Sequence, residues 1–179
     1  AEDPVDVRGV ASGTRAEIDL LAEVARLARV GQIQLVTHLE AVWELAGNLL
    51  LGPRQSIFGG IPVEHVGNPI PYSRRLTPFL GEGETVRSLT AAFLASLRDP
   101  RYLEIRRACG AFQGDRPSPP NQMMDAFLIW CADVAQVPYF LTTDLKLVRT
   151  VRLCKSVALS TRVVSPSQLM DALEERRSP

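Results

Sequence analysis

The sequence has few of the residues on which many metalloproteins and enzymes depend. It contains two histidines and three cysteines among 179 residues. Cys109, Cys131 and Cys154 are odd in number and have neither CxxC nor Cys/His spacing, which argues against a zinc site or a disulfide framework. We therefore expect reduced thiols and a cytoplasmic protein. With only His38 and His65 available, a catalytic centre built on histidine is poorly supplied.

Long apolar runs and an excess of charge of either sign are also absent. No apolar run approaches the length of a membrane span, and no signal-peptide pattern opens the sequence, so we expect no membrane association. Twenty basic residues balance twenty acidic ones, so the net charge does not indicate a polyanionic partner. The local distribution is different, because residues 145–162 contain five bases and no acid. These bases are Lys146, Arg149, Arg152, Lys155 and Arg162.

The length of the chain fits one domain with a proper core. Thr14 and Glu17 have the spacing of a capping box and open an amphipathic pattern that predicts a helix. Gly31 ends this helix, and an apolar segment at 33–37 predicts a buried strand. A second helix is predicted from about 39 to 51. Helix, glycine, strand and helix at this spacing form half of a βαβ unit, so we predict an α/β fold with a parallel sheet.

Residues 52–83 interrupt this pattern. They contain six glycines and five prolines, which disfavours a regular core element. We predict an irregular insertion that lies outside the central sheet and covers a crevice at the sheet edge or forms a subunit contact. Helical patterns return at about 84–97 and 101–111, and a loop at 114–120 follows. The chain is thus predicted to be a single domain, residues 1–179, with one insertion.

The segment DAFLIWCADVAQVPYFLTTD, from Asp125 to Asp144, is the most informative part of the sequence. It predicts an acid that opens a helix, a break at Pro138, a strand at 139–143 and a second acid where the strand ends. Groups at the carboxyl ends of parallel strands converge on one crevice. Two carboxylates there would suit a divalent metal that holds and polarises a phosphodiester. The alternative is that both acids are N-caps of the helices that follow them.

A second pattern follows downstream, in VVSPSQLMDAL at residues 163–173. Together the two segments give a D-A-hydrophobic helix, a strand ending in L-T-x-D, a basic helix, and a final strand followed by P-x-x-L-M. In this order they resemble the PIN domain family of metal-dependent nucleases, over residues 125–173. The resemblance implies a three-layer α/β fold with a central parallel sheet flanked by helices.

The resemblance also implies an acid in the helix after the second strand. Family members carry a Thr-Ser pair at the end of that strand. Aligning Thr37 and His38 with this pair puts Glu44 in the acid position. Glu40 lies one turn earlier on the same helical face and is the alternative.

A further acid is implied at the end of the first strand, in a D-x-N pattern. Asp6, between two valines, is the candidate in this sequence, although Arg8 stands where an asparagine is usual. The alternative is a first strand, with its acid, upstream of Ala1.

These patterns together imply an endoribonuclease that hydrolyses phosphodiester bonds with Mg²⁺ or Mn²⁺, with DNA as the alternative substrate. Lys146 and Arg149 would contact the phosphate backbone. Many relatives are toxins, so a small antitoxin-like inhibitor and a second copy of the chain are further candidate partners. The implied catalytic residues and metal ligands are Asp125, Asp144 and Glu44, with Asp6 as an additional ligand.

Three alternatives stay open at this point. The first is a PIN-like domain without catalysis that serves as a binding or scaffold module, which the incomplete pattern around Asp6 favours. The second is an unrelated flavodoxin-like domain, although no Gly-rich loop follows any predicted strand. The third concerns single residues. Lys146, Arg149, Arg152 and Lys155 would form only a solvated helix face instead of a phosphate-binding surface, and His38 would be only a polar residue at a strand end.

Overall fold

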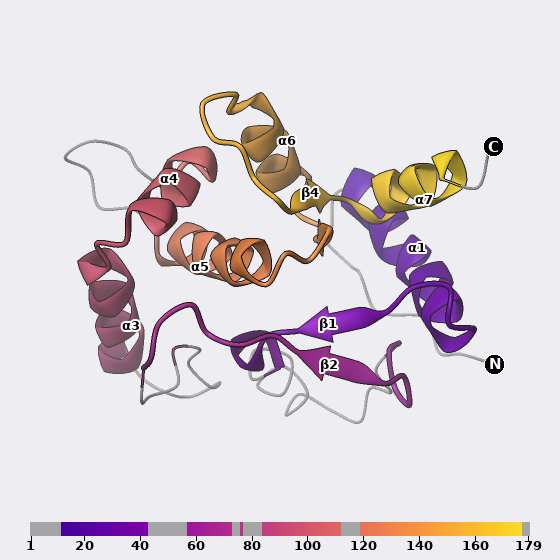
Figure 1. The fold of residues 1–179 in the computed structure, drawn as a ribbon, viewed down its shortest axis with the longest axis horizontal. Helices are drawn as coiled ribbons and strands as arrows, with labels where there is room; N and C mark the ends of the chain where they lie inside the picture. The colour runs from indigo at the N-terminus through magenta and orange to yellow at the C-terminus, as the bar shows by residue number, and fades with distance from the viewer. Residues whose placement is uncertain (1–11, 43–56, 73–75, 77–83, 112–118, 177–179) are drawn as a thin grey trace.

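The computed structural model describes residues 12–42, 57–72, 76, 84–111 and 119–176 (Figure 1). Within these ranges short strands alternate with helices, as expected for an α/β protein. In chain order the elements are α1 (Ser12–Arg29), β1 (Leu35–Thr37), β2 (Val63–His65), α3 (Glu84–Ser96), α4 (Pro100–Ala108), α5 (Pro120–Val134), β3 (Tyr139–Leu141), α6 (Leu145–Leu153), β4 (Arg162–Val164) and α7 (Pro166–Glu175).

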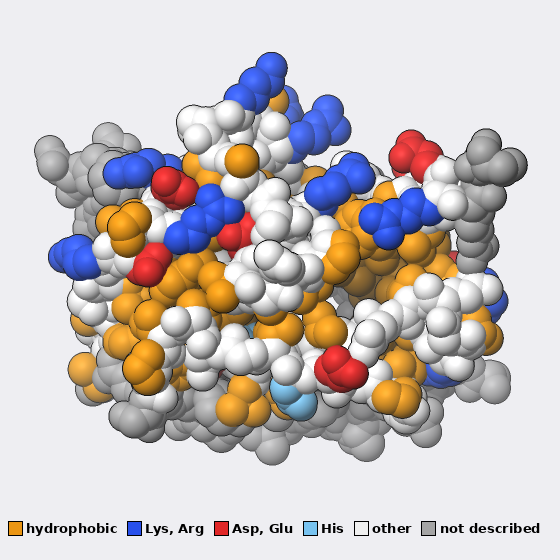
Figure 2. All heavy atoms as spheres, viewed as in Figure 1, with side chains coloured by type: hydrophobic (Ala, Val, Ile, Leu, Met, Phe, Trp, Pro, Cys, Tyr) orange, Lys and Arg blue, Asp and Glu red, His pale blue; other side chains and the backbone are white. Residues whose placement is uncertain are grey.

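The strands form two parallel pairs, β1 with β2 and β3 with β4. We call them the β1–β2 ribbon and the β3–β4 ribbon. Leu35 of β1 and Leu141 of β3 belong to the same hydrophobic cluster, yet no strand pairing joins the two ribbons within the described residues. Figure 2 shows the surface hollowed in the region between β1 and α7, with hydrophobic side chains around the hollow. The parallel pairing is confirmed, but a single central sheet is not seen in this part of the chain.

Helices cover both faces of the β3–β4 ribbon. Tyr139 and Leu141 pack in the cluster that contains Leu169 of α7. Phe140 packs instead against the cluster around Phe127 of α5. Because successive strand residues point to opposite faces, α7 and α5 must lie on opposite sides of the ribbon. Helix α1 packs against α7, and α3 and α4 pack against α5, which completes the two helical layers (Figure 1).

The main core lies around α5. Its apolar face buries Phe127, Ile129 and Trp130, and Trp130 is 2% exposed. Tyr102 of α4 packs against Trp130 with a ring-centroid separation of 5.3 Å. A fully buried aromatic side chain stabilises a fold by roughly 1.5–3 kcal/mol through the burial of its apolar surface. This cluster therefore fixes α4 and α5 as one unit next to β3.

Several predicted boundaries agree with the structure. Helix α1 ends at Arg29, and Gly31 follows with φ of +71°, a conformation that glycine adopts without steric cost. Helix α7 begins after Ser165, whose side chain accepts from the backbone of Gln168 while the Gln168 side chain accepts from the backbone of Ser165. This reciprocal capping box satisfies backbone donors at the start of α7.

Three sequence predictions are wrong in detail. The interval 52–83 was expected to lie outside the sheet, but Val63–His65 forms β2 and pairs with β1. All three β2 residues are exposed, so the strand needs no apolar side chains and the sequence carries no apolar pattern for it. Backbone pairing with β1 forms this strand. Helix α5 begins at Pro120, ahead of Asp125. Helix α1 begins at Ser12, and Glu17 contacts α7 instead of capping its own helix.

Candidate metal and substrate site

Asp144 lies directly beyond the carboxyl end of β3 and is the N-cap of α6. Its Oδ1 accepts hydrogen bonds from the backbone N–H groups of Lys146 at 2.9 Å and Leu147 at 3.0 Å. Its own N–H donates to Oγ1 of Thr142 at 3.1 Å. The N-cap interpretation is therefore confirmed for Asp144. Both capping bonds use Oδ1, and Oδ2 of this exposed residue bonds to no described residue.

Asp125 occupies a different position from the one predicted. It lies within α5, after the first turn, so it is not an N-cap. Its side chain is half-buried. Burial raises the pKa of the Cys109 thiol to about 12, and the negative charge of Asp125 adds to this increase, which means that Asp125 lies near the end of α4. The capping alternative is thus wrong for Asp125.

Glu40, the alternative to Glu44, has a structural role. It is 1% exposed, and its Oε1 accepts from the hydroxyl of Tyr72 at 3.0 Å and from the N–H of Leu76 at 2.9 Å. Burial raises the pKa of Tyr72, and the charge of Glu40 raises it further. Glu40 therefore anchors Tyr72 and Leu76 against the helical turn at 39–42. Glu44 and Asp6 lie outside the described residues, so their assignment stays a prediction.

His38 is a polar residue at the end of a strand, as the simpler alternative proposed. It is 5% exposed, and its ring stands edge-on to Phe127 with a centroid separation of 5.7 Å. Its Nδ1 accepts from the N–H of Glu40 at 3.2 Å, so its Nε2 carries the proton that it shares with Oδ1 of Asn68 at 2.5 Å. Both ring nitrogens are occupied, which leaves none for acid–base chemistry on a substrate.

The basic residues of α6 face solvent. Leu147 and Val148 are buried on one side of the helix, whereas Lys146, Arg149 and Arg152 are exposed on the other. None of these three bases forms an ion pair with an acid in the described ranges. Figure 2 shows basic side chains projecting where Figure 1 places α6. The start of this basic face adjoins Asp144, because Lys146 follows it by only two residues.

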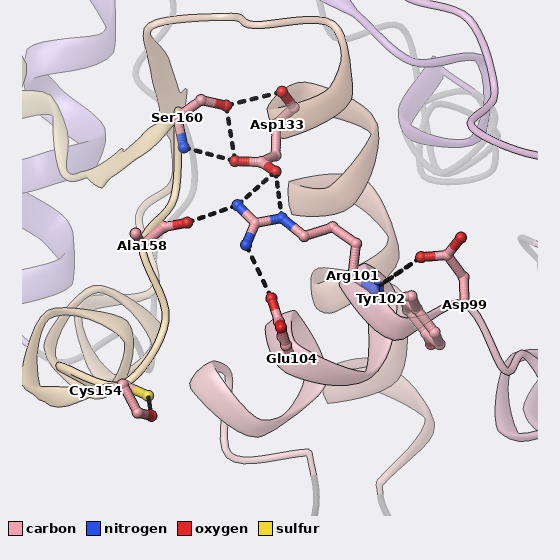
Figure 3. A network of polar contacts seen from close by, with 9 residues as sticks. Asp99, Arg101, Tyr102, Glu104, Asp133, Cys154, Ala158 and Ser160 are labelled. Atoms are coloured by element: carbon pink, nitrogen blue, oxygen red, sulfur yellow. Dashed lines mark hydrogen bonds and ion pairs between the residues drawn. The ribbon is translucent and has the colours of Figure 1, made fainter.

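One strong polar network was missed from the sequence (Figure 3). Asp133, in the last turn of α5, accepts from Nε and Nη2 of Arg101, each at 2.8 Å, and its Oδ1 accepts from the N–H of Ser160 at 2.7 Å. Burial opposes ionisation of Asp133, but the hydrogen bonds from Arg101 and Ser160 outweigh it and lower its pKa. Arg101 also donates to the carbonyl of Ala158 at 2.6 Å. The network fixes the segment that leads into β4. The role of this network is structural. In the sequence, the only sign of it is an acid near the end of an otherwise apolar helix.

The described residues do not by themselves complete a metal site. No group of three or more His, Cys, Asp or Glu side chains within them is arranged to hold a metal ion. Several buried acids are already committed to structural hydrogen bonds, namely Glu17, Glu40 and Asp133.

In comparisons with known proteins, no protein-family profile, curated protein or solved structure matches this chain. The helices in the described ranges are too short or too polar for any of them to cross a membrane.

Proposed function

We propose that this protein is a divalent-metal-dependent nuclease, with RNA as its substrate and Asp144 as the central metal ligand. One observation carries the proposal: Asp144 caps α6 through Oδ1, at the carboxyl end of β3, and its Oδ2, beside a basic helix, bonds to no residue in the described part of the chain. Carboxylate oxygen is the ligand type that Mg²⁺ and Mn²⁺ prefer. Asp144 therefore fits the implied metal.

The positions of the two aspartates relative to α5 and β3 support a shared site. Asp125 lies nine helical steps, about 14 Å, before Val134 at the end of α5, and Asp144 lies just beyond the carboxyl end of the three-residue strand β3. Because α5 contacts β3 and only a short connection joins them, the chain reverses between the two elements. Both carboxylates are therefore expected at the same end of this pair.

The residues of the chain have distinct roles in this proposal. Asp144 and Asp125 supply negatively charged oxygen ligands, together with Glu44 and Asp6. Mg²⁺ or Mn²⁺ bound there would lower the pKa of a water molecule and offset charge on the scissile phosphate. Lys146 and Arg149 would bind adjacent phosphates of the same strand. No nucleophilic side chain is required.

The experiment that tests the proposal compares two aspartate N-caps. Asp99 caps α4 in the same way as Asp144 caps α6, since its Oδ1 accepts from the N–H groups of Arg101 at 2.8 Å and Tyr102 at 3.2 Å. Asparagine preserves capping but removes the charge that holds a divalent ion. Asp144→Asn should lower cleavage of labelled RNA by at least about 100-fold, whereas Asp99→Asn should leave it unchanged.

The assay uses intact protein with Mg²⁺, Mn²⁺ or EDTA, and Mn²⁺ binding is followed separately by electron paramagnetic resonance. Circular dichroism checks that both variants fold. Cleavage that survives both EDTA and Asp144→Asn would reject the metal mechanism.

A binding or scaffold module without catalysis is the second candidate. The observation in its favour is that the described residues contribute no group of three metal-binding side chains. Inactivity of the wild-type protein on varied RNA and DNA, together with unchanged Mn²⁺ binding in Asp144→Asn, would support this function over the nuclease.

A further inference from the structure

A groove of about 420 Å³ runs beside β4, between α6 and α7. Residues of α6, of the segment before β4, of β4 itself and of α7 line it, and β3 contributes none of them. The groove therefore lies on the outer side of β4, away from β3. Its apolar lining includes Val151 of α6, Leu159 in the segment before β4, and Ala172 of α7.

The backbone of β4 is open toward this groove. Arg162 N–H donates to the carbonyl of Pro138 at 2.9 Å, and the carbonyl of Val164 accepts from Thr142 N–H at 3.0 Å. In a parallel ladder, alternate residues bond to the same neighbour. The N–H and C=O of Val163, between these two residues, consequently point to the other edge. There, within the described residues, β4 has no strand partner.

The two walls of the groove differ in charge. On α7, Asp171 and Glu175 stand one turn apart and are exposed, and neither makes an ion pair or hydrogen bond with a described residue. On α6, the wall consists of Val151 and the exposed Arg152. An acidic wall thus faces a largely apolar wall that carries one base, and the exposed Arg162 of β4 adds a second base to the lining.

Thr161 supplies an independent sign of an incomplete contact. It lines the groove, is 1% exposed, and its Oγ1 has no hydrogen-bond partner among the described residues. Leaving a buried hydroxyl unpaired disfavours the folded state, so a polar group of a bound molecule would be stabilising there.

We propose that this groove binds an extended segment of a partner protein, which adds as a strand to β4 and carries basic side chains at alternate positions. The free N–H and C=O of Val163 match the backbone of an added strand. Side chains of such a strand alternate between the walls. One set meets Asp171 and Glu175, which attract bases, and the other meets the apolar surface around Val151. This interaction is separate from the proposed nuclease activity and does not depend on it.

The probe is a capped, fluorescently labelled peptide of about eight residues that alternates lysine with valine, slightly longer than an average strand. Binding is measured by fluorescence anisotropy at low salt, and by hydrogen exchange of the Val163 amide. We expect saturable binding and slower exchange at Val163. A peptide of the same sequence with N-methyl groups at alternate positions should bind at least about tenfold more weakly, because it loses backbone donors.

The protein variant is Asp171→Lys combined with Glu175→Lys. Its matched control is Asp19→Lys combined with Glu23→Lys, which has the same spacing on α1, outside the groove. We expect about tenfold weaker binding for the α7 pair and unchanged binding for the α1 pair. Val163→Pro removes the outward N–H without removing a bond to β3, and it should also weaken binding.

Four results would overturn the proposal. The first is that the lysine–valine peptide does not bind, and the second is that the N-methylated peptide binds equally well. The third is that the α7 and α1 variants lose binding affinity equally. The fourth is that this chain forms a dimer that Val163→Pro abolishes, while the peptide does not bind. The last result would assign the edge to a second copy of the chain.

Discussion

Arg101 and Asp133 form an ion pair that joins the start of α4 to the end of α5, with Nε and Nη2 of Arg101 each 2.8 Å from Oδ2 of Asp133. The negative end of the helix dipole disfavours an acid in the last turn of a helix. Arg101 and Ser160 compensate for this and lower the pKa of Asp133. The pair therefore predicts how stability depends on pH.

Asp133→Asn should lower the free energy of unfolding at neutral pH by roughly 2 kcal/mol, because Arg101 loses a charged acceptor. The folded pKa of Asp133 is lower than its unfolded value, so its stabilisation is present above about pH 4 and is lost as pH falls through the folded pKa. Urea unfolding between pH 2 and 7 should show that the free energy of unfolding of the variant decreases less as the pH falls.

Glu104, which contacts the same arginine at 3.0 Å but is largely exposed, provides the control. Glu104→Gln should change stability by less than about 0.5 kcal/mol, and an equal effect of both variants would argue against this role of burial.

Glu17 of α1 should stabilise the start of α7. Its Oε2 accepts from the N–H of Ser167 at 2.9 Å, and its Oε1 accepts from the Ser167 hydroxyl at 2.7 Å. Glu17→Ala should lower the free energy of unfolding by about 1–2 kcal/mol, as expected for a lost N-terminal capping interaction. Asp19→Ala, an exposed position on the same helix, should have almost no effect. Equal stability of Glu17→Ala and the wild type in urea would contradict the capping role.

Tyr72 should matter for stability at alkaline pH. Its hydroxyl donates to Glu40 at 3.0 Å, and burial followed by the charge of Glu40 raises its pKa. A raised folded pKa gives stabilisation that is present below the unfolded value of about 10 and is lost as pH rises above it. Tyr72→Phe should cost about 1–3 kcal/mol at pH 7 and reduce the loss of stability above pH 10. Tyr139→Phe is the control, since the Tyr139 hydroxyl bonds to no described residue. The prediction fails if both variants have the same alkaline profile as the wild type.

The basic face of α6 should affect RNA binding more than turnover. Lys146→Ala combined with Arg149→Ala should raise KM and leave kcat at saturating RNA within about twofold. Binding should lose about one to two units of its salt slope, because fewer counterions are released. Filter binding at several salt concentrations measures the slope, with the exposed Arg15→Ala of α1 as the control. An unchanged slope would identify this face as a solvated surface.

Local sequence patterns predicted the elements whose ends are determined by neighbouring residues. Gly31, which has a positive φ, ended α1, and the Pro-x-x-Leu-Met pattern after the last strand marked the start of α7. The sequence also identified Asp144 as a candidate N-cap at the end of β3, because its capping partners Lys146 and Leu147 lie only two and three residues further along the chain. In these cases the signal and its cause lie within a few residues of each other.

Features that depend on distant partners were not predictable in this way. Glu17 matched a capping box locally, but its partner Ser167 lies 150 residues away. Glu40 looked like a candidate ligand because Tyr72, which buries it, is 32 residues away. Strand β2 has no apolar signal of its own and exists through its pairing with β1.

The contact between Glu17 and Ser167 also has a consequence for synthesis of the protein on the ribosome. Helix α1 emerges early, but Ser167 emerges 150 residues later. At a typical rate of about 5–20 residues per second, Val24 of α1 waits roughly 8–30 seconds for Leu169 of α7. During that interval this part of α1 is open to chaperones and to other nascent chains, whereas Ala25 and Ala28 pack with Ile61, which emerges much earlier. Codon choice between these two helices, rather than at either one, should therefore control how much of the protein reaches its folded state in the cell.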